Sequence, residues 1–215
     1  FDLKTANYFY TRLGNPTCGH VEEKIAALEG GVGAMLTSSG QAATLTSVLT
    51  IAKAGDRILC SASVYGGTFN LMAVTFKRMG IEVDFFEQSE SDEEIAKRIY
   101  PNTKAIFGET IANPALTVFD ISRFAALAHK HEIPLIIDNT FATPILCKPF
   151  DFGADIVVHS TTKFLDGHAV QVGGVVVDSG KFDWAKSSKF PEFTTPDDSY
   201  HGLIYTQAFG NQAFI

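Results

Sequence analysis

Short apolar runs, rich in β-branched residues, alternate along this chain with segments of helical periodicity, and this alternation limits the fold more than any other feature. Such runs, bounded by turn residues, are typical of strands that are buried on both faces. Strand–helix alternation predicts βαβ units and a mainly parallel sheet, and right-handed crossovers place helices on both of its faces. We therefore predict an α/β fold with three layers, α/β/α. Strands are expected at residues 33–37, 57–61, 81–86, 104–108, 135–137, 156–158 and 172–177.

Capping residues predict where the helices between these strands begin. Thr17 is expected to cap the first helix, which Gly30-Gly31 ends. Ser91 and Glu94 fit a capping box for a short helix, and Asp120 opens a longer one. Beyond residue 179 the periodicity fails, so an irregular segment is predicted there.

The composition excludes several classes of function. With 215 residues, the chain is long enough for one sizeable core and for one or at most two domains. Its net charge is -7 and it has no lysine–arginine run, which argues against nucleic acid or an anionic membrane as a partner. No apolar stretch reaches the roughly 18 residues that span a bilayer. The three cysteines lack metal or redox spacing, so we expect no metal site and a reduced, cytoplasmic setting.

Two of the expected strands each deliver a chemically active residue at the carboxyl end. Asp138 follows the run at 135–137, and Lys163 follows the run at 156–158 after a series of hydroxyl residues. Open parallel sheets bind their ligands outside the carboxyl ends of the strands. A lysine beside hydroxyls, with a fixed carboxylate nearby, is the arrangement needed to hold an aldehyde cofactor as a Schiff base.

Each of these two residues also has a plainer interpretation. Most lysines at strand ends are simply solvated, but Lys163 closely follows apolar and hydroxyl residues. We expect it to be partly desolvated, which lowers the pKa of a lysine and makes its amine nucleophilic. Asp138 is either a turn or N-cap aspartate, or the acceptor for the protonated ring nitrogen of pyridoxal phosphate.

Small-residue loops offer candidate contacts to a phosphate and to a planar ring. Ser38-Ser39-Gly40-Gln41 precedes a helix, whose first N–H groups and dipole bind phosphate, although many such loops only pack. The loop does not match the G-x-x-x-x-G-K-[ST] pattern of nucleoside triphosphate sites. Ser160 and Thr162 are candidates for hydroxyl contacts to the same phosphate. Tyr65 suits packing as well as it suits stacking on a ring, and Asn113 lies in an expected turn.

Together these residues resemble the trans-sulfuration, or Cys/Met metabolism, family of pyridoxal-phosphate enzymes. The matching motifs occur between Tyr10 and Gly174 in the family's order and at its spacing. Each motif alone is a weak signal, whereas the ordered set is a strong one. The motifs are Tyr10-Thr11-Arg12, Gly14-Asn15-Pro16-Thr17, Leu28-Glu29-Gly30-Gly31, Ser38-Ser39-Gly40-Gln41-Ala42-Ala43, Tyr65-Gly66-Gly67-Thr68, Glu109 through Asn113-Pro114, Asp138-Asn139-Thr140, and Ser160-x-Thr162-Lys163.

The resemblance implies a role for each matched position. Lys163 would carry pyridoxal 5'-phosphate and then transfer protons, Asp138 would bind the ring nitrogen, and Tyr65 would stack on the ring. These three are the expected catalytic residues. Tyr10 and Arg12 would reach into the site of a neighbouring subunit. The expected cofactor-binding residues are Tyr10, Arg12, Gly40, Gln41, Tyr65, Asn113, Asp138, Thr140, Ser160, Thr162 and Lys163, with the phosphate held by Gly40, Gln41, Ser160 and Thr162.

Within the family, three features are most similar to O-acetylhomoserine sulfhydrylases: Gln41, the segment 167–171, and the long segment after Gly174. This similarity implies a transferase of methionine biosynthesis that performs γ-replacement on O-acetyl-L-homoserine. Acetate would leave, and sulfide or methanethiol would add to give homocysteine or methionine. Methionine γ-lyase, cystathionine γ-synthase and cystathionine γ-lyase remain alternatives, as do an inactive fragment and a binding module on the same fold.

The resemblance also implies a domain organisation. Residues 14–178 would form the large, pyridoxal-phosphate-binding domain of the aspartate-aminotransferase-like fold (fold type I). An arm at 1–13 would reach a neighbouring subunit, and 179–215 would be a family insertion with an irregular tail. The family's C-terminal small domain is absent, so we expect a truncated chain. The expected assembly is a homotetramer built from dimers, acting on a small amino-acid substrate and a sulfur donor.

Overall fold

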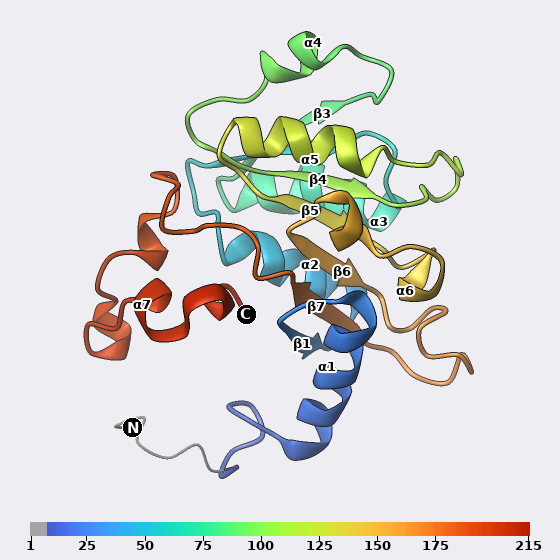
Figure 1. Ribbon diagram of the computed structural model, residues 1–215. Coiled ribbons are helices and arrows are strands. Elements are labelled where there is room, and N and C mark those ends of the chain that lie inside the picture. The colour runs from blue at the N-terminus through green and yellow to red at the C-terminus, as the bar shows by residue number, and fades with distance from the viewer. Residues whose placement is uncertain (1–7) are drawn as a thin grey trace.

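A seven-stranded sheet organises the computed structural model, which describes residues 8–215 (Figure 1). Strand β7 runs antiparallel to its neighbours β1 and β6, and the other pairings are parallel. The prediction of a mainly parallel sheet is confirmed. In sheet order the strands are β1 (Gly33–Thr37), β7 (Gly174–Asp178), β6 (Ile156–His159), β5 (Leu135–Asp138), β4 (Thr103–Glu109), β2 (Arg57–Ser61) and β3 (Glu82–Phe86).

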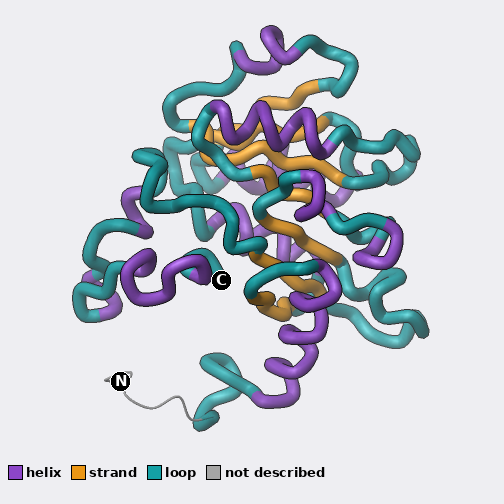
Figure 2. The backbone as a smooth tube through the Cα atoms, viewed as in Figure 1, coloured by secondary structure: helices purple, strands orange, loops and turns teal. Residues whose placement is uncertain are grey.

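Helices cover both faces of this sheet (Figures 1 and 2). Helix α5 packs on β4 and β5 in front of the sheet, and α2 packs on β1, β6 and β7 behind it, which confirms the three-layer prediction. Within residues 8–215, no helix has the length and apolar character needed to cross a membrane. The helices are α1 (Pro16–Glu29), α2 (Gly40–Leu49), α3 (Gly66–Asn70), which continues as a π-helical turn (Leu71–Phe76), α4 (Asp92–Ala96), α5 (Ile121–Lys130), α6 (Thr143–Leu146) and α7 (Tyr205–Phe209).

The predicted cap of the first helix is wrong. Asn15, rather than Thr17, is the N-cap of α1, and its Oδ1 accepts hydrogen bonds from the N–H groups of Thr17 (2.9 Å) and Cys18 (3.3 Å). Pro16 stands in the first helical turn, where the missing N–H costs nothing because it would lack an intrahelical partner anyway. The helix therefore starts as soon as Asn15 has capped it.

The centre of the sheet is apolar on both faces. The runs Leu135–Ile137 and Ile156–Val158 are buried throughout, as expected of central parallel strands. Under α5, the Phe124 ring lies 4.6 Å from that of Phe119 and 4.8 Å from that of Phe86, measured between ring centroids. The three rings, from α5, from β3 and from the segment before α5, are part of the buried core.

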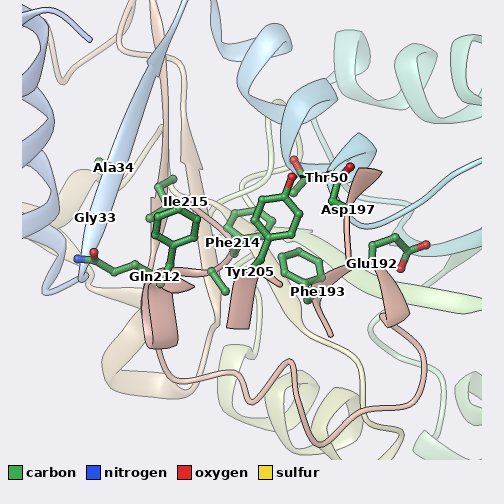
Figure 3. A pocket seen from close by; sticks show the side chains of 12 residues that line it. Gly33, Ala34, Thr50, Glu192, Phe193, Asp197, Tyr205, Gln212, Phe214 and Ile215 are labelled. Carbon is green, nitrogen blue, oxygen red and sulfur yellow. Dashed lines mark hydrogen bonds between the residues drawn. The ribbon is translucent and has the colours of Figure 1, made fainter. Parts of the chain in front are cut away.

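Residues 179–215 contain only short helices and turns, and several of their aromatic side chains belong to the buried hydrophobic core. Trp184 is buried and stacks on Phe193 (ring centroids 4.5 Å apart) and on Phe214 (5.5 Å). A cavity of about 660 Å³ lies beside this cluster and is lined in part by Phe193 and Phe214. Figure 3 shows the side chains around it. Among them, the hydroxyl of Tyr205 donates to Asp197 Oδ2 at 2.6 Å. The segment is therefore part of the folded core.

The parallel strands β2, β4, β5 and β6 end at the same edge of the sheet. Their register places Glu109 opposite Asp138, and Asp138 opposite Val158. The loops that follow these strands consequently emerge side by side, at the position where open α/β sheets bind ligands.

Phe124 provides a test of the core packing. The change Phe124→Ala removes a fully buried ring and should lower the free energy of unfolding by about 3–5 kcal/mol. Phe152→Ala is the matched control, because that ring is 50% exposed, and it should cost less than about 1 kcal/mol. Urea unfolding followed by circular dichroism measures both variants, and equal losses would contradict the core assignment of Phe124.

Candidate active site

A cavity of about 290 Å³ lies at the carboxyl ends of the parallel strands. The loops after β2, β4, β5 and β6 all contribute to its wall, although they are far apart in the sequence. Five predicted site residues are brought together here. The residues that line the cavity are Tyr65, Glu109, Asn113, Asp138, Thr140, Phe141, Lys163 and Phe164.

Asp138 is held by the loop that follows it. Its Oδ1 accepts hydrogen bonds from the N–H (3.0 Å) and the hydroxyl (2.5 Å) of Thr140. Burial raises the pKa of Asp138 above its ordinary value, while these hydrogen bonds and the nearby His159 act in the opposite direction. A cationic group placed beside Asp138 would stabilise the ionised carboxylate. The residue is thus suited to binding a protonated nitrogen.

Lys163 lines the same cavity as Asp138, which was predicted. Its backbone N–H donates to the carbonyl of Ser160 at 3.2 Å and closes a turn after β6. The prediction that Lys163 is partly desolvated is wrong, because its side chain is exposed. It stands at the start of an exposed stretch that includes Phe164 and residues 167–171. The amine is therefore accessible to a ligand that enters the cavity.

The first turn of α2 lies directly against Ser160. A Cβ on Gly40 would come within 2.4 Å of the Cβ of Ser160, so glycine allows an approach that a larger residue would block. Ser39 caps the helix, and the N–H groups of Gly40 and Gln41 have no partner within it. Ser160 also donates its N–H to Thr140 Oγ1 at 2.8 Å. The N-terminus of α2 is thereby connected to the loop that holds Asp138.

Other predicted residues lie away from the cavity wall. Gln41 Nε2 donates to Thr68 Oγ1 at 3.1 Å. The hydroxyl of Thr162 is bonded to the backbone of Gly173, also at 3.1 Å. Both side chains therefore have partners within the chain, and their predicted phosphate contacts stay predictions.

Tyr10 and Arg12 are exposed and do not line the cavity. The guanidinium carbon of Arg12 lies 5.4 Å from the centre of the Tyr10 ring. The two side chains therefore contact each other, and their predicted entry into a neighbouring subunit's site stays a prediction. Residues 1–7 of the predicted arm lie outside the described residues.

Glu109 belongs to the cavity, although the sequence reasoning did not select it as a site residue. Its Oε2 accepts the backbone N–H of Tyr65 at 2.6 Å and so fixes the start of α3. Burial, together with the neighbouring charge of Asp138, raises the pKa of Glu109 to about 8. One signal could have identified Glu109: it is an acid at the end of a strand, and the neighbouring strand ends at Asp138.

Phe141 and Phe164 form the remaining apolar wall and were also missed. Their rings meet edge to face, with centroids 5.6 Å apart. Both lie in loops, where a single aromatic residue shows no periodicity that would predict its neighbours. The pair narrows the cavity beside Lys163.

Comparison with known proteins gives a consistent assignment. The model of the family described as "Cys/Met metabolism PLP-dependent enzyme" matches residues 1–207. The homocysteine/cysteine synthase of Kluyveromyces lactis is 48% identical over 217 residues, covering 100% of this chain and 49% of the relative. The O-acetyl-L-homoserine sulfhydrylase of Corynebacterium glutamicum is 50% identical over 218 residues, covering 100% and 50%. The chain spans about half the length of these relatives.

Solved structures give the same result. An enzyme of Campylobacter jejuni, described as an O-acetylhomoserine (thiol)-lyase, has a TM-score of 0.94 and 35% identity, covering 99% of this chain and 52% of that one. That structure contains a pyridoxyl-lysine monophosphate. A cystathionine γ-lyase of Lactobacillus plantarum, complexed with L-serine, has a TM-score of 0.77 and 42% identity, covering 82% and 46%. The sheet and helices described above therefore have the architecture of fold type I enzymes.

Glu109 leads to a prediction about the pH dependence of stability. Its pKa is about 8 in the folded chain and 4.5 as an unperturbed group, so the folded state binds the proton more tightly. The stability that this proton contributes is present below about pH 4.5 and is lost as the pH rises through about 8. The free energy of unfolding of the wild type should therefore fall over this range relative to that of Glu109→Gln.

The glutamine variant keeps an oxygen that accepts the N–H of Tyr65, and it cannot titrate. Urea unfolding between pH 5 and pH 9 measures the difference. Glu23→Gln is the control, because the side chain of Glu23 is 82% exposed. If the wild type and Glu109→Gln had parallel pH profiles, the raised pKa of Glu109 would be refuted.

Proposed function

The chain belongs to the Cys/Met metabolism family of PLP-dependent enzymes, and we propose that its cavity holds pyridoxal 5'-phosphate for γ-replacement on O-acetyl-L-homoserine by the whole protein. Sulfide or methanethiol would replace acetate and give homocysteine or methionine. The observation that carries this proposal is the single cavity that Lys163 and Asp138 both line.

The residues present fit this cofactor. Pyridoxal phosphate has an aldehyde, a ring nitrogen and a phosphate, and each would have a suitable partner. The amine of Lys163 would take the aldehyde, and the carboxylate of Asp138 would take the ring nitrogen. The N-terminus of α2 and Ser160, which the close approach at Gly40 holds together, would supply donors to one phosphate.

Further residues would complete the cofactor site. Tyr65 would stack on the ring, since it lines the cavity and its backbone is fixed by Glu109. The remaining contacts that we propose come from the cavity wall, from the phosphate region and from a neighbouring subunit. Asn113 and Thr140 would contribute from the cavity wall. Gly40, Gln41 and Thr162 would contribute from the phosphate region. Tyr10 and Arg12 would come from a neighbouring subunit.

Bound pyridoxal phosphate supplies an electron sink that makes hydrogen atoms on the α- and β-carbons of the substrate acidic. Lys163 Nζ would hold the cofactor and would later move protons at these carbons. Asp138 would keep a proton on the ring nitrogen, because a nearby carboxylate raises the pKa of that nitrogen. Phe141 and Phe164 would form the apolar wall beside Lys163.

The substrate proposal rests on the names of the similar proteins. Proteins named homocysteine synthase and O-acetyl-L-homoserine sulfhydrylase match the full chain at 48% and 50% sequence identity. A cystathionine γ-lyase activity is the second candidate, and the likeness to the Lactobacillus plantarum structure favours it. Methionine γ-lyase and cystathionine γ-synthase would need the same cofactor site and would differ in the groups that bind the substrate.

We also propose the domain organisation and assembly that this function requires. Residues 1–13 would form the arm, 14–178 the cofactor domain and 179–215 the insertion. The arm would carry Tyr10 and Arg12 into the cavity of a neighbouring subunit, in a cytoplasmic homotetramer built from dimers. The exposure of both side chains in the single chain supports this arrangement.

The cofactor proposal predicts the result of Lys163→Ala. The full-length protein is incubated with pyridoxal phosphate, reduced with borohydride, and digested for mass spectrometry. The wild type should carry the reduced cofactor on Lys163, whereas the variant should carry none, because no other lysine lines the cavity within residues 8–215. Lys77→Ala, which removes an exposed lysine elsewhere, should label normally. A wild type labelled at another lysine would refute the assignment of Lys163.

The substrate proposal predicts a preference between two reactions. With O-acetyl-L-homoserine and sulfide, the full-length protein should release homocysteine and acetate. With methionine alone, ammonia and an α-keto acid should form at least about tenfold more slowly, equivalent to about 1.4 kcal/mol in the barrier. Thiol and ammonia assays on the same preparation measure both rates. Faster release of ammonia from methionine would instead identify a γ-lyase.

A further inference from the structure

Glu29, a buried carboxylate outside the cavity, contacts both of the loops that carry the proposed catalytic residues. It is the last residue of α1 and is fully buried. Its Oε1 lies 3.0 Å from Asn139 Nδ2 and 2.5 Å from His159 Nε2. Asn139 directly follows Asp138, and His159 ends the strand that leads to Lys163. One oxygen atom of Glu29 therefore links the end of β5, which carries Asp138, to the end of β6, which leads to Lys163.

These contacts close a ring with the loop on the cavity side. Thr140 Oγ1 donates to Asp138 and accepts the N–H of Ser160 at 2.8 Å. Ser160 is the next residue after His159. Three hydrogen bonds and two short stretches of backbone thus form a closed circuit. In order, the circuit passes through Glu29, Asn139, Thr140, Ser160 and His159.

Asn139 has no freedom to adjust within this circuit. It is fully buried, and its Oδ1 accepts the hydroxyl of Thr110 at 2.8 Å. Its Nδ2 donates to the carbonyl of Cys147 at 2.9 Å in addition to Glu29. Because these polar groups are all engaged, loss of Glu29 as an acceptor would leave one buried N–H of Asn139 unpaired next to Asp138.

The circuit lowers stability more than a purely structural contact would be expected to. Glu29 Oε2 and His159 Nδ1 are buried and have no hydrogen-bond partner among residues 8–215. Unpartnered buried polar atoms cost stability, and apolar residues of similar volume often replace buried ion pairs without loss. A polar pair retained at the junction of two site loops therefore indicates a positioning role.

We propose that Glu29 is a positioning residue that fixes the loop of Asp138 relative to the loop of Lys163, so that one bound pyridoxal phosphate meets both. This inference rests on the proposed function, because it assigns the two loops to a single ligand. Glu29 does not line the cavity and acts only through Asn139 and His159.

Two substitutions of similar size test the proposal. Glu29→Gln keeps an oxygen that accepts from both Asn139 and His159, whereas Glu29→Met fills the space without an acceptor. The readout is the dissociation constant of pyridoxal phosphate, measured by equilibrium dialysis of the full-length protein. Glu29→Gln should stay within about threefold of the wild type, and Glu29→Met should bind at least about tenfold more weakly. Glu23→Met, on the exposed side of the same helix, is the control and should bind like the wild type.

A double-mutant cycle with His159→Phe separates positioning from general loosening. His159 does not line the cavity, and it is the other partner of Glu29 Oε1 in the circuit. Once Glu29→Met has opened the circuit, a second break should add little, so the double variant should bind less than about threefold more weakly than the weaker single variant. A loss equal to the product of the two single losses would overturn the proposal.

The remaining outcomes are equally decisive. Glu29→Met binding as tightly as the wild type, or Glu29→Gln binding as weakly as Glu29→Met, would overturn the positioning role. If circular dichroism shows that Glu29→Met does not fold, His159→Phe takes its place, because it opens the circuit at the other Glu29 contact and should bind at least about tenfold more weakly than the wild type. Failure of the proposed function is distinguishable, because the wild type itself would then take up no cofactor on Lys163.

Discussion

The register of the central parallel strands is the constraint on which the other features depend. Strands β4, β5 and β6 are buried on both faces, so a slip of one residue would misplace every apolar side chain in the core. The same register sets Glu109 opposite Asp138 and brings the loop of Lys163 beside them. The cavity is thus a product of strand pairing, and core packing is what keeps its chemistry in place.

Much of this arrangement could be predicted, because strand ends are visible in the sequence. The β-branched runs before Asp138 and His159 predicted two buried strands, and parallel pairing then predicted that Asp138 and Lys163 share a cavity. The exposure of Lys163 could not be predicted, because it depends on how the turn after Ser160 leaves the sheet. Phe141 and Phe164 were missed for a related reason, since loop residues meet through tertiary packing that no local pattern describes.

The cavity contains two carboxyl groups whose environments differ. Two carboxyl groups, Asp138 and Glu109, stand on neighbouring strands, and burial raises the pKa of both. They differ in their partners: the ionised form of Asp138 is favoured by both the hydroxyl and the N–H of Thr140, whereas Glu109 accepts one N–H, from Tyr65, and faces the charge of Asp138. This asymmetry suits one acid to bind a cation and the other to remain protonated near neutral pH.

The aromatic cluster of the C-terminal segment has a practical consequence. Trp184 is the only tryptophan of the chain, and its indole is stacked on Phe193 and Phe214. Its fluorescence emission is therefore an intrinsic probe of residues 179–215 that needs no label. A red shift in that emission would report water entering this cluster, and its timing relative to the loss of sheet structure would show whether the segment detaches before the sheet unfolds.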